Sequence, residues 1–154
     1  MSDKLTVINK NNCTGCKMCE LACAFFHDRI FNPSAARIYV EKAEDEGTDI
    51  PTICHHCDNE ACRLACPEDA FYLSDLGILK IDEKKCTGCK ACIKACPFNA
   101  IRLSPYSGKA IKCDLCDGSP QCVEWCPSRV LDFKGQVKNS LIERSSLPYK
   151  EGAK

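Results

Sequence analysis

The sequence predicts a small α+β fold, in which short β-hairpins and short helices surround groups of cysteine side chains rather than a large apolar core. Three observations lead to this expectation. The 154 residues include sixteen cysteines, which occur in four groups. Residues 6–23 and 79–96 match at the same register, so the chain contains an internal repeat. Two pairs of short apolar runs flank turn-forming residues, which is the pattern of β-hairpins.

The N-terminal part of the chain predicts one strand followed by the first cysteine group. Residues 5–8 alternate between apolar and polar side chains, as in a half-buried strand. The group that follows comprises Cys13, Cys16, Cys19 and Cys23. The apolar run 25–32 then contains His27, which we expect to pack against its neighbours rather than to bind metal.

The second group is preceded by a predicted strand and a charged loop. Residues 37–41 alternate and predict a strand, whereas the acidic segment 41–49 predicts a loop that leads to Pro51. The group itself comprises Cys54, Cys57, Cys62 and Cys66, followed by Pro67. Residues 70–73 and 77–81 are short apolar runs around a turn, so they predict a hairpin that leads to the third group.

The third group has the most informative spacing. It comprises Cys86, Cys89, Cys92 and Cys96, with two residues between each of the first three, three residues before the fourth, and Pro97 directly after it. This run binds iron-sulfur clusters in bacterial ferredoxins, where the fourth cysteine ligates the other cluster of a pair. The first group repeats this spacing, except that Cys23 is followed by Ala24 rather than by proline.

The fourth group is similar to the second, because both have a longer gap between their second and third cysteines. Residues 100–103 and 109–112 predict a hairpin before it. The group comprises Cys113, Cys116, Cys122 and Cys126, followed by Pro127. The two histidines between Cys54 and Cys57 also suggest zinc, but zinc sites take two well-separated ligand pairs. Four crowded cysteines that end in Cys-Pro favour iron-sulfur clusters.

Composition and charge restrict the class of protein. The chain shows no apolar signal segment and no apolar run that could span a bilayer, so we expect a cytoplasmic protein without a membrane span. In a reducing compartment, the thiols are expected to bind metal rather than to form disulfides. The formal net charge is +0, but four clusters with their thiolates would each add about −2. Lysines beside the motifs therefore indicate compensation of this charge, or ordinary solvated surface, rather than a nucleic-acid site. They are Lys17, Lys84, Lys85, Lys90, Lys94 and Lys112.

The order of the motifs resembles a known family. In chain order, the sequence has the first cysteine group with its short spacing, the segment from Pro51 to Cys57, the third group with its ferredoxin-like spacing, and the segment from Lys112 to Cys116. The same order is found in the four-cluster electron-transfer subunits of multi-subunit oxidoreductases, such as the beta subunits of formate dehydrogenase and dimethyl sulfoxide reductase. Small iron-sulfur subunits of formate hydrogenlyase and tungsten aldehyde oxidoreductase complexes are similar. The resemblance covers about residues 5–133, and this chain lacks the long insertions of many members.

The resemblance also implies how the groups combine. Spacing alone leaves two pairings open: the first group with the second and the third with the fourth, or the inner two together and the outer two together. The resemblance implies the latter, with two ferredoxin-like lobes. The inner lobe would span about residues 51–104, and the outer lobe residues 1–50 and 105–133. The spaced apolar residues of the tail 134–154 indicate a segment that lies along a partner, and a frayed terminus is the alternative. Four [4Fe-4S] clusters would be bound by Cys13, Cys16, Cys19 and Cys126; by Cys54, Cys57, Cys62 and Cys96; by Cys86, Cys89, Cys92 and Cys66; and by Cys113, Cys116, Cys122 and Cys23.

The expected function is electron transfer without catalysis. Every cysteine group is complete, and the sequence contains no nucleotide-binding glycine loop or nucleophile-base pair, so we expect no catalytic residues. The resemblance implies a relay of single electrons between a catalytic subunit, a molybdenum or tungsten pterin enzyme, and a ferredoxin, flavoprotein or hydrogenase subunit. Two alternatives are a free-standing polyferredoxin that shuttles electrons by diffusion and a zinc-stabilised interaction module.

Overall fold

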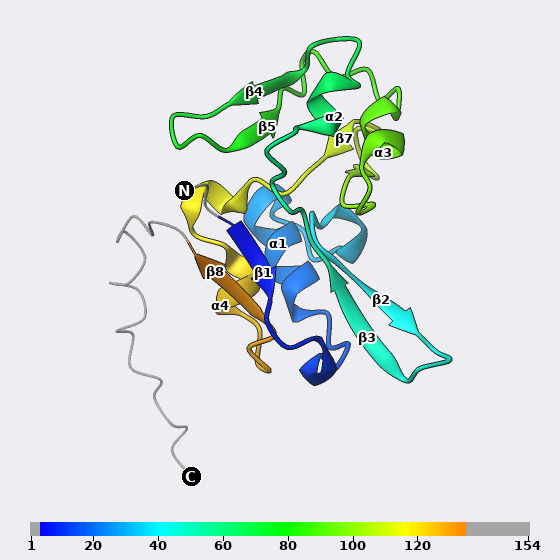
Figure 1. Ribbon diagram of the computed structural model, residues 1–154, viewed down its shortest axis with the longest axis vertical. Coiled ribbons are helices and arrows are strands. Elements are labelled where there is room, and N and C mark those ends of the chain that lie inside the picture. Colours follow the sequence, from blue (N-terminus) through cyan, green and yellow to red (C-terminus); the bar gives the residue numbers. More distant parts are fainter. Residues whose placement is uncertain (1–3, 135–154) are drawn as a thin grey trace.

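The computed structural model describes residues 4–134, which form short helices and strands linked by loops (Figure 1). The α-helices are α1 (Met18–Asp28), α2 (Ala61–Leu64), α3 (Ala91–Ala95) and α4 (Gln121–Glu124). The strands are β1 (Lys4–Val7), β2 (Tyr39–Ala43), β3 (Thr48–Thr52), β4 (Phe71–Leu73), β5 (Leu79–Ile81), β6 (Arg102–Leu103), β7 (Ala110–Ile111) and β8 (Leu131–Lys134). Within this part of the chain, none of the helices has the length and apolar character needed to cross a membrane. The tail that was expected to contact a partner, apart from Lys134, lies outside the described residues.

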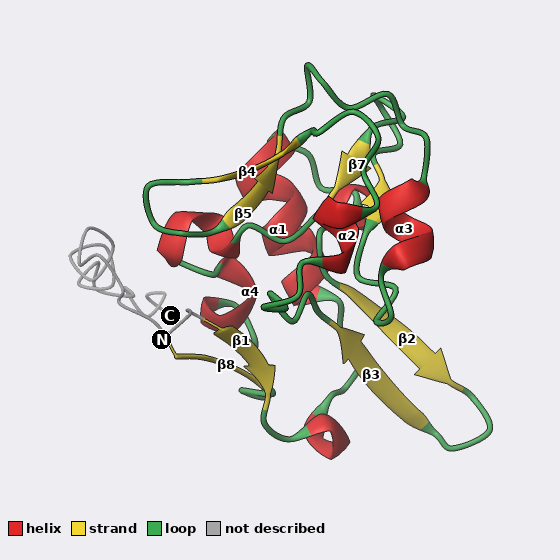
Figure 2. Ribbon diagram, turned by 45° about the horizontal axis from the view of Figure 1, so that its top comes forward, coloured by secondary structure: helices red, strands yellow, loops and turns green. Residues whose placement is uncertain are grey.

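The described strands form four separate two-stranded antiparallel sheets rather than one large sheet. Three of them are hairpins formed by consecutive strands: β2 with β3, β4 with β5, and β6 with β7. The fourth pairs β1 with β8 (Figure 2), and in its register Leu5 lies opposite Phe133. The first and last strands of the described residues are therefore neighbours, and this pairing brings the first and fourth cysteine groups to the same part of the molecule.

Most of the predicted strands are present, but one loop prediction is wrong. The strand registers confirm the two predicted hairpins, since Phe71 pairs with Ile81 and Arg102 with Ile111. The predicted strand at residues 5–8 is present as β1. The segment 41–49, in contrast, belongs largely to a hairpin, because β3 pairs along its whole length with β2. Pro51 fits in β3 because a strand of a two-stranded sheet has one free edge, where the missing N–H leaves no gap in the ladder.

The buried side chains form two groups, which belong mainly to different sets of elements. The larger group lies among β1, α1, β2, α4 and β8 and includes Leu5, Ala24, Ile38, Val40, Ile53, Ile78, Leu115 and Leu131. The smaller lies among β4, β5, α3 and β7 and includes Phe71, Leu79, Ile101 and Ala110. Cysteines belong to both groups. Each group contains few apolar side chains. The stability of the fold must therefore depend on the groups that the cysteines bind.

Helix α1 is fixed against β2 by a buried carboxylate. Glu20 is only 2% exposed, and its Oε1 accepts a hydrogen bond from the backbone N–H of Val40 over 2.7 Å. The ammonium of Lys17 lies 3.9 Å from the other carboxylate oxygen. Because α1 also carries Cys19 and Cys23, this contact sets the position of two cysteines relative to the β2–β3 hairpin.

Candidate iron-sulfur centres

The sixteen cysteines converge on four cavities, and no two of them form a disulfide. Each cavity is lined by three cysteines of one motif and by the last cysteine of another. We number them as follows: site 1 has Cys13, Cys16, Cys19 and Cys126; site 2 has Cys113, Cys116, Cys122 and Cys23; site 3 has Cys54, Cys57, Cys62 and Cys96; site 4 has Cys86, Cys89, Cys92 and Cys66. The cavities therefore bring together the same cysteines as the crossed quartets that the resemblance implies.

The motifs share one turn that shapes each cavity. The residue before the second cysteine has a positive φ in all four: 63° at Gly15, 45° at His56, 73° at Gly88 and 56° at Leu115. Such a turn aims successive N–H groups at one point and forms a concave site for an anion. Glycine adopts this conformation without strain, whereas His56 and Leu115 adopt it at a cost. The common turn is visible in the sequence only where it contains glycine.

A second turn follows three of the four terminal cysteines. Cys66, Cys96 and Cys126 are each followed by proline, and the backbone N–H four residues later donates to the cysteine sulfur over 3.5, 3.4 and 3.4 Å. Cys23 lacks the proline and remains within α1, and its sulfur accepts instead from the N–H of Arg37 over 3.2 Å. The departure of the first motif from the Cys-Pro pattern is thus compensated by a residue from outside the motif.

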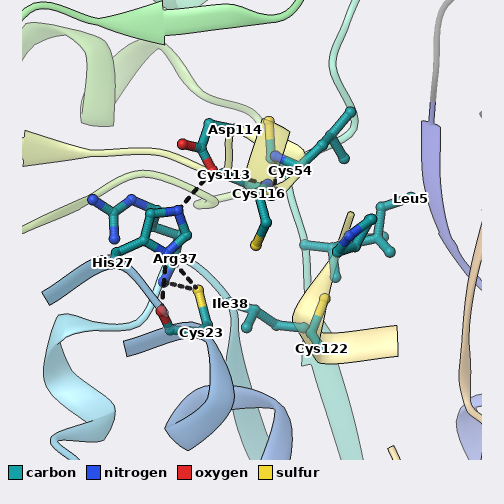
Figure 3. Close-up of a pocket in the computed structure, with 13 residues that line it drawn as sticks. Leu5, Cys23, His27, Arg37, Ile38, Cys54, Cys113, Asp114, Cys116 and Cys122 are labelled. Atoms are coloured by element: carbon teal, nitrogen blue, oxygen red, sulfur yellow. Dashed lines mark hydrogen bonds and ion pairs between the residues drawn. The ribbon is translucent and has the colours of Figure 1, made fainter. Parts of the chain in front are cut away.

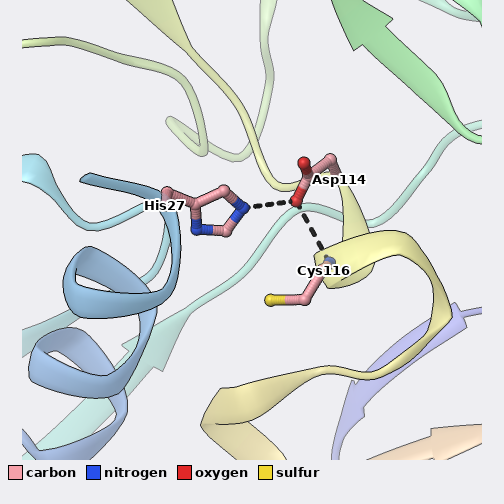
Figure 4. A group of neighbouring side chains, drawn as sticks. All are labelled: His27, Asp114 and Cys116. Atoms are coloured by element: carbon pink, nitrogen blue, oxygen red, sulfur yellow. Dashed lines mark hydrogen bonds and ion pairs between the residues drawn. The ribbon is translucent and has the colours of Figure 1, made fainter. Parts of the chain in front are cut away.

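Site 2 has a polar network that sequence reasoning missed (Figure 3). Nδ1 of His27 donates to the carbonyl oxygen of Cys23 over 2.9 Å, and Nε2 donates to Oδ1 of Asp114 over 2.8 Å. The same Oδ1 accepts from the N–H of Cys116 over 3.1 Å (Figure 4). Burial alone would lower the pKa of His27, but its hydrogen bonds raise the pKa to about 9. With this pKa the imidazole is protonated at neutral pH, and both ring nitrogens then donate.

The pKa of the partner carboxylate, Asp114, is shifted in the opposite direction. Burial alone would raise the pKa of Asp114, but the hydrogen bond from His27 lowers the pKa to about 2. His27 was expected to be a packed residue rather than a ligand, whereas Asp114 and Arg37 were not singled out at all. The spacing of four residues between Cys23 and His27, which places both on one face of a helix, was the signal available in the sequence.

Buried positive charge near sites 2 and 3 fits an anionic group in the cavities. Lys112 is only 6% exposed, and its ammonium donates to the carbonyl oxygens of Leu79 and Cys113 over 3.0 Å each. Within residues 4–134 it forms no ion pair with a carboxylate. Arg37 also lines site 2; its buried Nη1 has no hydrogen-bond partner but lies 3.7 Å from Oδ2 of Asp28, so of the two, Lys112 is the cation that lacks a carboxylate among the described residues. Buried cations are costly without a counter-anion, which an iron-sulfur cluster with its thiolates would provide.

The thiols themselves also fit metal ligation. Burial raises the pKa of Cys19 and of Cys116 to about 12, and that of Cys92 to about 11. Without a metal these groups would remain neutral thiols at physiological pH. A coordinating metal ion deprotonates a thiol and neutralises the thiolate, so the donor set suits iron in a buried site.

The four sites lie in series. Cys54 of site 3 also lines the cavity of site 2. Burial raises the pKa of Cys122 in site 2, and nearby thiols that include Cys19 of site 1 raise it further. Burial likewise raises the pKa of Cys92 in site 4, with a contribution from Cys62 of site 3. Sites 1 and 4 are therefore the two ends of the series.

The sites differ in their access to solvent. All sixteen cysteines lie in the described part of the chain, and only Cys16 of site 1 and Cys89 of site 4 are exposed. The cavity at site 3 is wide, about 1280 Å³, and is bordered by a ring of Phe98 that stacks on His55 at 3.9 Å. The other three cavities measure about 10 to 20 Å³. Because solvent exposure is one of the factors that set the potential of a cluster, we expect the four sites to differ in potential.

Comparisons with known proteins agree with this chemistry. A 4Fe-4S dicluster domain model matches residues 47–136, and a 4Fe-4S binding domain model matches residues 10–25. An anaerobic dimethyl sulfoxide reductase chain of Escherichia coli (strain K12) is 38% identical in an alignment of 95 residues, which covers 54% of this chain and 46% of that protein. A tetrathionate reductase subunit of Archaeoglobus fulgidus is 40% identical over 87 residues, 55% of this chain and 41% of that protein. The matches thus span less than half the length of these curated relatives.

A solved structure extends the likeness along the sequence. One chain of the active site complex BamBC of benzoyl coenzyme A reductase, in complex with zinc, is 26% identical with a TM-score of 0.51. The alignment covers 98% of this chain and 92% of that one. The dicluster model alone covers more than half of the residues, and it includes the cysteines of sites 3 and 4. This chain therefore belongs to the 4Fe-4S dicluster domain family.

Proposed function

We propose that this chain is an electron-transfer subunit that holds four [4Fe-4S] clusters, one in each of sites 1 to 4. In each site, three thiolates of one motif and the terminal thiolate of another would be the ligands. A cluster of this kind takes up and releases one electron. The observation that carries the proposal is the convergence of all sixteen cysteines on four cavities that lie in series.

The protein surroundings suit a relay of electrons. Burial excludes water from Cys23, Cys116 and Cys122 of site 2, while N–H donors and the cations of His27, Arg37 and Lys112 stabilise negative charge near sites 2 and 3. The exposed cysteines are found only at the ends, so that an electron can enter beside Cys16 and leave beside Cys89, or the reverse. We propose that each end lies in one of the two lobes that the resemblance implies, the inner lobe near residues 51–104 and the outer lobe formed by the remainder up to residue 133.

We further propose that the partners are a catalytic oxidoreductase subunit and a second redox protein. The relatives that carry the motifs are named as chains of dimethyl sulfoxide and tetrathionate reductases, which supports a catalytic partner of this general class. A molybdenum or tungsten pterin subunit on one side, and a ferredoxin, flavoprotein or hydrogenase subunit on the other, would match the resemblance of the motifs.

Anaerobic purification from the source cells tests both parts of this proposal. The protein should contain about sixteen iron atoms and as many acid-labile sulfides, as four cubane clusters require. Molybdenum or tungsten should co-elute with it in size-exclusion chromatography. Four clusters without a co-eluting pterin metal would instead favour a free-standing polyferredoxin, and stoichiometric zinc with little iron would contradict the cluster assignment.

A further inference from the structure

The loop that supplies three cysteines of site 4 is rich in lysine, although Glu68 also lines the cavity of this site. Residues 84–94, which supply three of its four cysteines, contain four lysines and no acidic residue. The four are exposed: Lys84, Lys85, Lys90 and Lys94. None of them lies within ion-pair distance of a carboxylate in the part of the chain that the structure describes. The preceding Asp82 accepts from the backbone N–H of Lys84 over 2.9 Å rather than pairing with a lysine side chain.

The internal repeat provides a control for the role of these lysines. The same loop is built at site 1, with Gly15 and Gly88 at equivalent positions and with similar φ. The residues equivalent to Lys84, Lys85 and Lys94 are Asn11, Asn12 and Leu21, so only the position of Lys90 is basic in both copies. If the lysines served only to compensate the charge of a cluster, site 1 would need them equally. Their restriction to site 4 points to a role at that end alone.

The local energetics also speak against a structural role. Lys90 is the cap residue that directly precedes α3, with a left-handed φ of 65°, and Lys94 lies within the helix. A cation at the start of a helix opposes the helix dipole. An arrangement that costs stability within the chain becomes favourable when an external anion lies against it.

The opposite end of the series has the opposite charge. The carboxylate of Asp49 lies against Gly15 in the loop of site 1, where an added Cβ would be 2.5 Å from Oδ2. The segment 41–49, which forms most of the β2–β3 hairpin, contains five acidic residues and one lysine. Lys17 beside Cys16 is 3.9 Å from Glu20, unlike its equivalent Lys90. The two ends of the series therefore present different electrostatic surfaces to their partners.

We propose that the lysine-rich surface around Cys89 is the docking site for a small acidic one-electron carrier protein. This inference rests on the proposed function, since it assumes that site 4 holds a cluster at the end of the series. In the complex, one electron passes between the site 4 cluster and the carrier, so that one centre is oxidised and the other reduced without a change in bonding. The charge complementarity would accelerate encounter, because steering of this kind raises association rates by about 10 to 1,000-fold and weakens with salt.

Stopped-flow electron exchange with an acidic plant-type [2Fe-2S] ferredoxin tests the proposal. The holoprotein and the ferredoxin are mixed anaerobically in whichever redox direction is downhill, and the visible spectrum of the ferredoxin reports the transfer. Replacing three lysines that are absent from site 1, Lys84→Gln, Lys85→Gln and Lys94→Gln, should lower the second-order rate constant about tenfold or more at low ionic strength. The difference between variant and wild type should disappear at high ionic strength, where exposed charges are screened.

A matched variant separates local docking from net charge. Glu44→Gln, Asp45→Asn and Glu46→Gln remove three exposed charges from the hairpin beside site 1, and this variant should exchange electrons with the ferredoxin at the wild-type rate. If the rate constant of this variant rose by as large a factor as that of the lysine variant falls, only net charge would matter, and the inference would be overturned. Basic cytochrome c serves as a second probe. It should exchange electrons with the lysine variant no more slowly than with the wild type.

The outcomes distinguish this inference from the proposed function. Iron content and the spectral change on reduction by dithionite are measured on every variant. If four clusters are present and the lysine variant reacts with ferredoxin at the wild-type rate, the docking site is refuted while the electron-transfer function stands. If the wild-type holoprotein exchanges electrons with neither ferredoxin nor cytochrome c, the proposed function fails and the docking site with it.

Discussion

Replacing Gly88 by alanine tests how tightly the loop of site 4 is packed, and the internal repeat supplies its control at Gly15. Both glycines precede the second cysteine of a Cys-Thr-Gly-Cys motif, and their φ values are 73° and 63°. An added Cβ at Gly88 would lie 2.4 Å from the backbone oxygen of Gly108, whereas at Gly15 it would meet the end of the Asp49 side chain at 2.5 Å. The two substitutions therefore share their backbone strain and differ in what must move.

The magnitudes follow from these contacts. A non-glycine residue in the left-handed region costs about 1–2 kcal/mol, and both variants incur this cost. At Gly88 the carbonyl of Gly108 must also retreat by about 0.6 Å, from 2.4 to 3.0 Å, and overpacking of this kind costs about 1–3 kcal/mol. The carboxylate of Asp49 can rotate away at little cost. We therefore expect a destabilisation of about 2–5 kcal/mol for Gly88→Ala and about 1–2 kcal/mol for Gly15→Ala.

The measurement is the rate of iron release on heating the anaerobic holoprotein at fixed temperature. Cluster loss is irreversible, so a rate is the appropriate measure of stability. Since about 1.4 kcal/mol in a barrier is tenfold in rate, Gly88→Ala should release iron about tenfold faster than Gly15→Ala. The double variant Gly15→Ala with Asp49→Ala should release iron at about the rate of Gly15→Ala alone, because the Asp49 side chain contributes little to the loss at site 1. Equal rates for the two single variants would show that the contact with Gly108 does not constrain the loop.

Three further predictions test other parts of the structure. Cys66→Ser should perturb the cluster of site 4 in electron paramagnetic resonance spectra, and damage to site 3 instead would contradict the crossed assignment. Glu20→Ala leaves the buried N–H of Val40 without its acceptor, so the holoprotein should lose about 1.5–3 kcal/mol of stability to heat or denaturant. The exposed control Glu41→Ala on β2 should change stability by less than about 0.5 kcal/mol, and equal effects would refute the role of the Val40 contact. Complete removal of iron by an anaerobic chelator should abolish the cooperative unfolding transition seen by circular dichroism, because so little apolar core remains, and a folded apoprotein would contradict this.

Local features of the molecule could be predicted from the sequence because they depend on residues that are close together in the chain. The spacing of Cys86, Cys89 and Cys92 defines a loop that can surround a cluster, and the apolar runs around a turn define the β4–β5 and β6–β7 hairpins. The β2–β3 hairpin was missed because its acidic residues and Pro51 are rare in strands, although a two-stranded sheet with an open edge accommodates both.

The sequence by itself determined the chemistry of this protein: sixteen thiols in four complete motifs, and hence the 4Fe-4S class. Only the tertiary structure decided which distant residues meet. It pairs β1 with β8, brings Cys126 to Cys13, and places Asp114 beside His27 and Lys112 between two sites. These contacts join residues separated by much of the chain, and they are set by the simultaneous packing of all the elements. A local spacing specifies only the neighbours within a few residues, so it identifies three cysteines of each site while the fold selects the fourth.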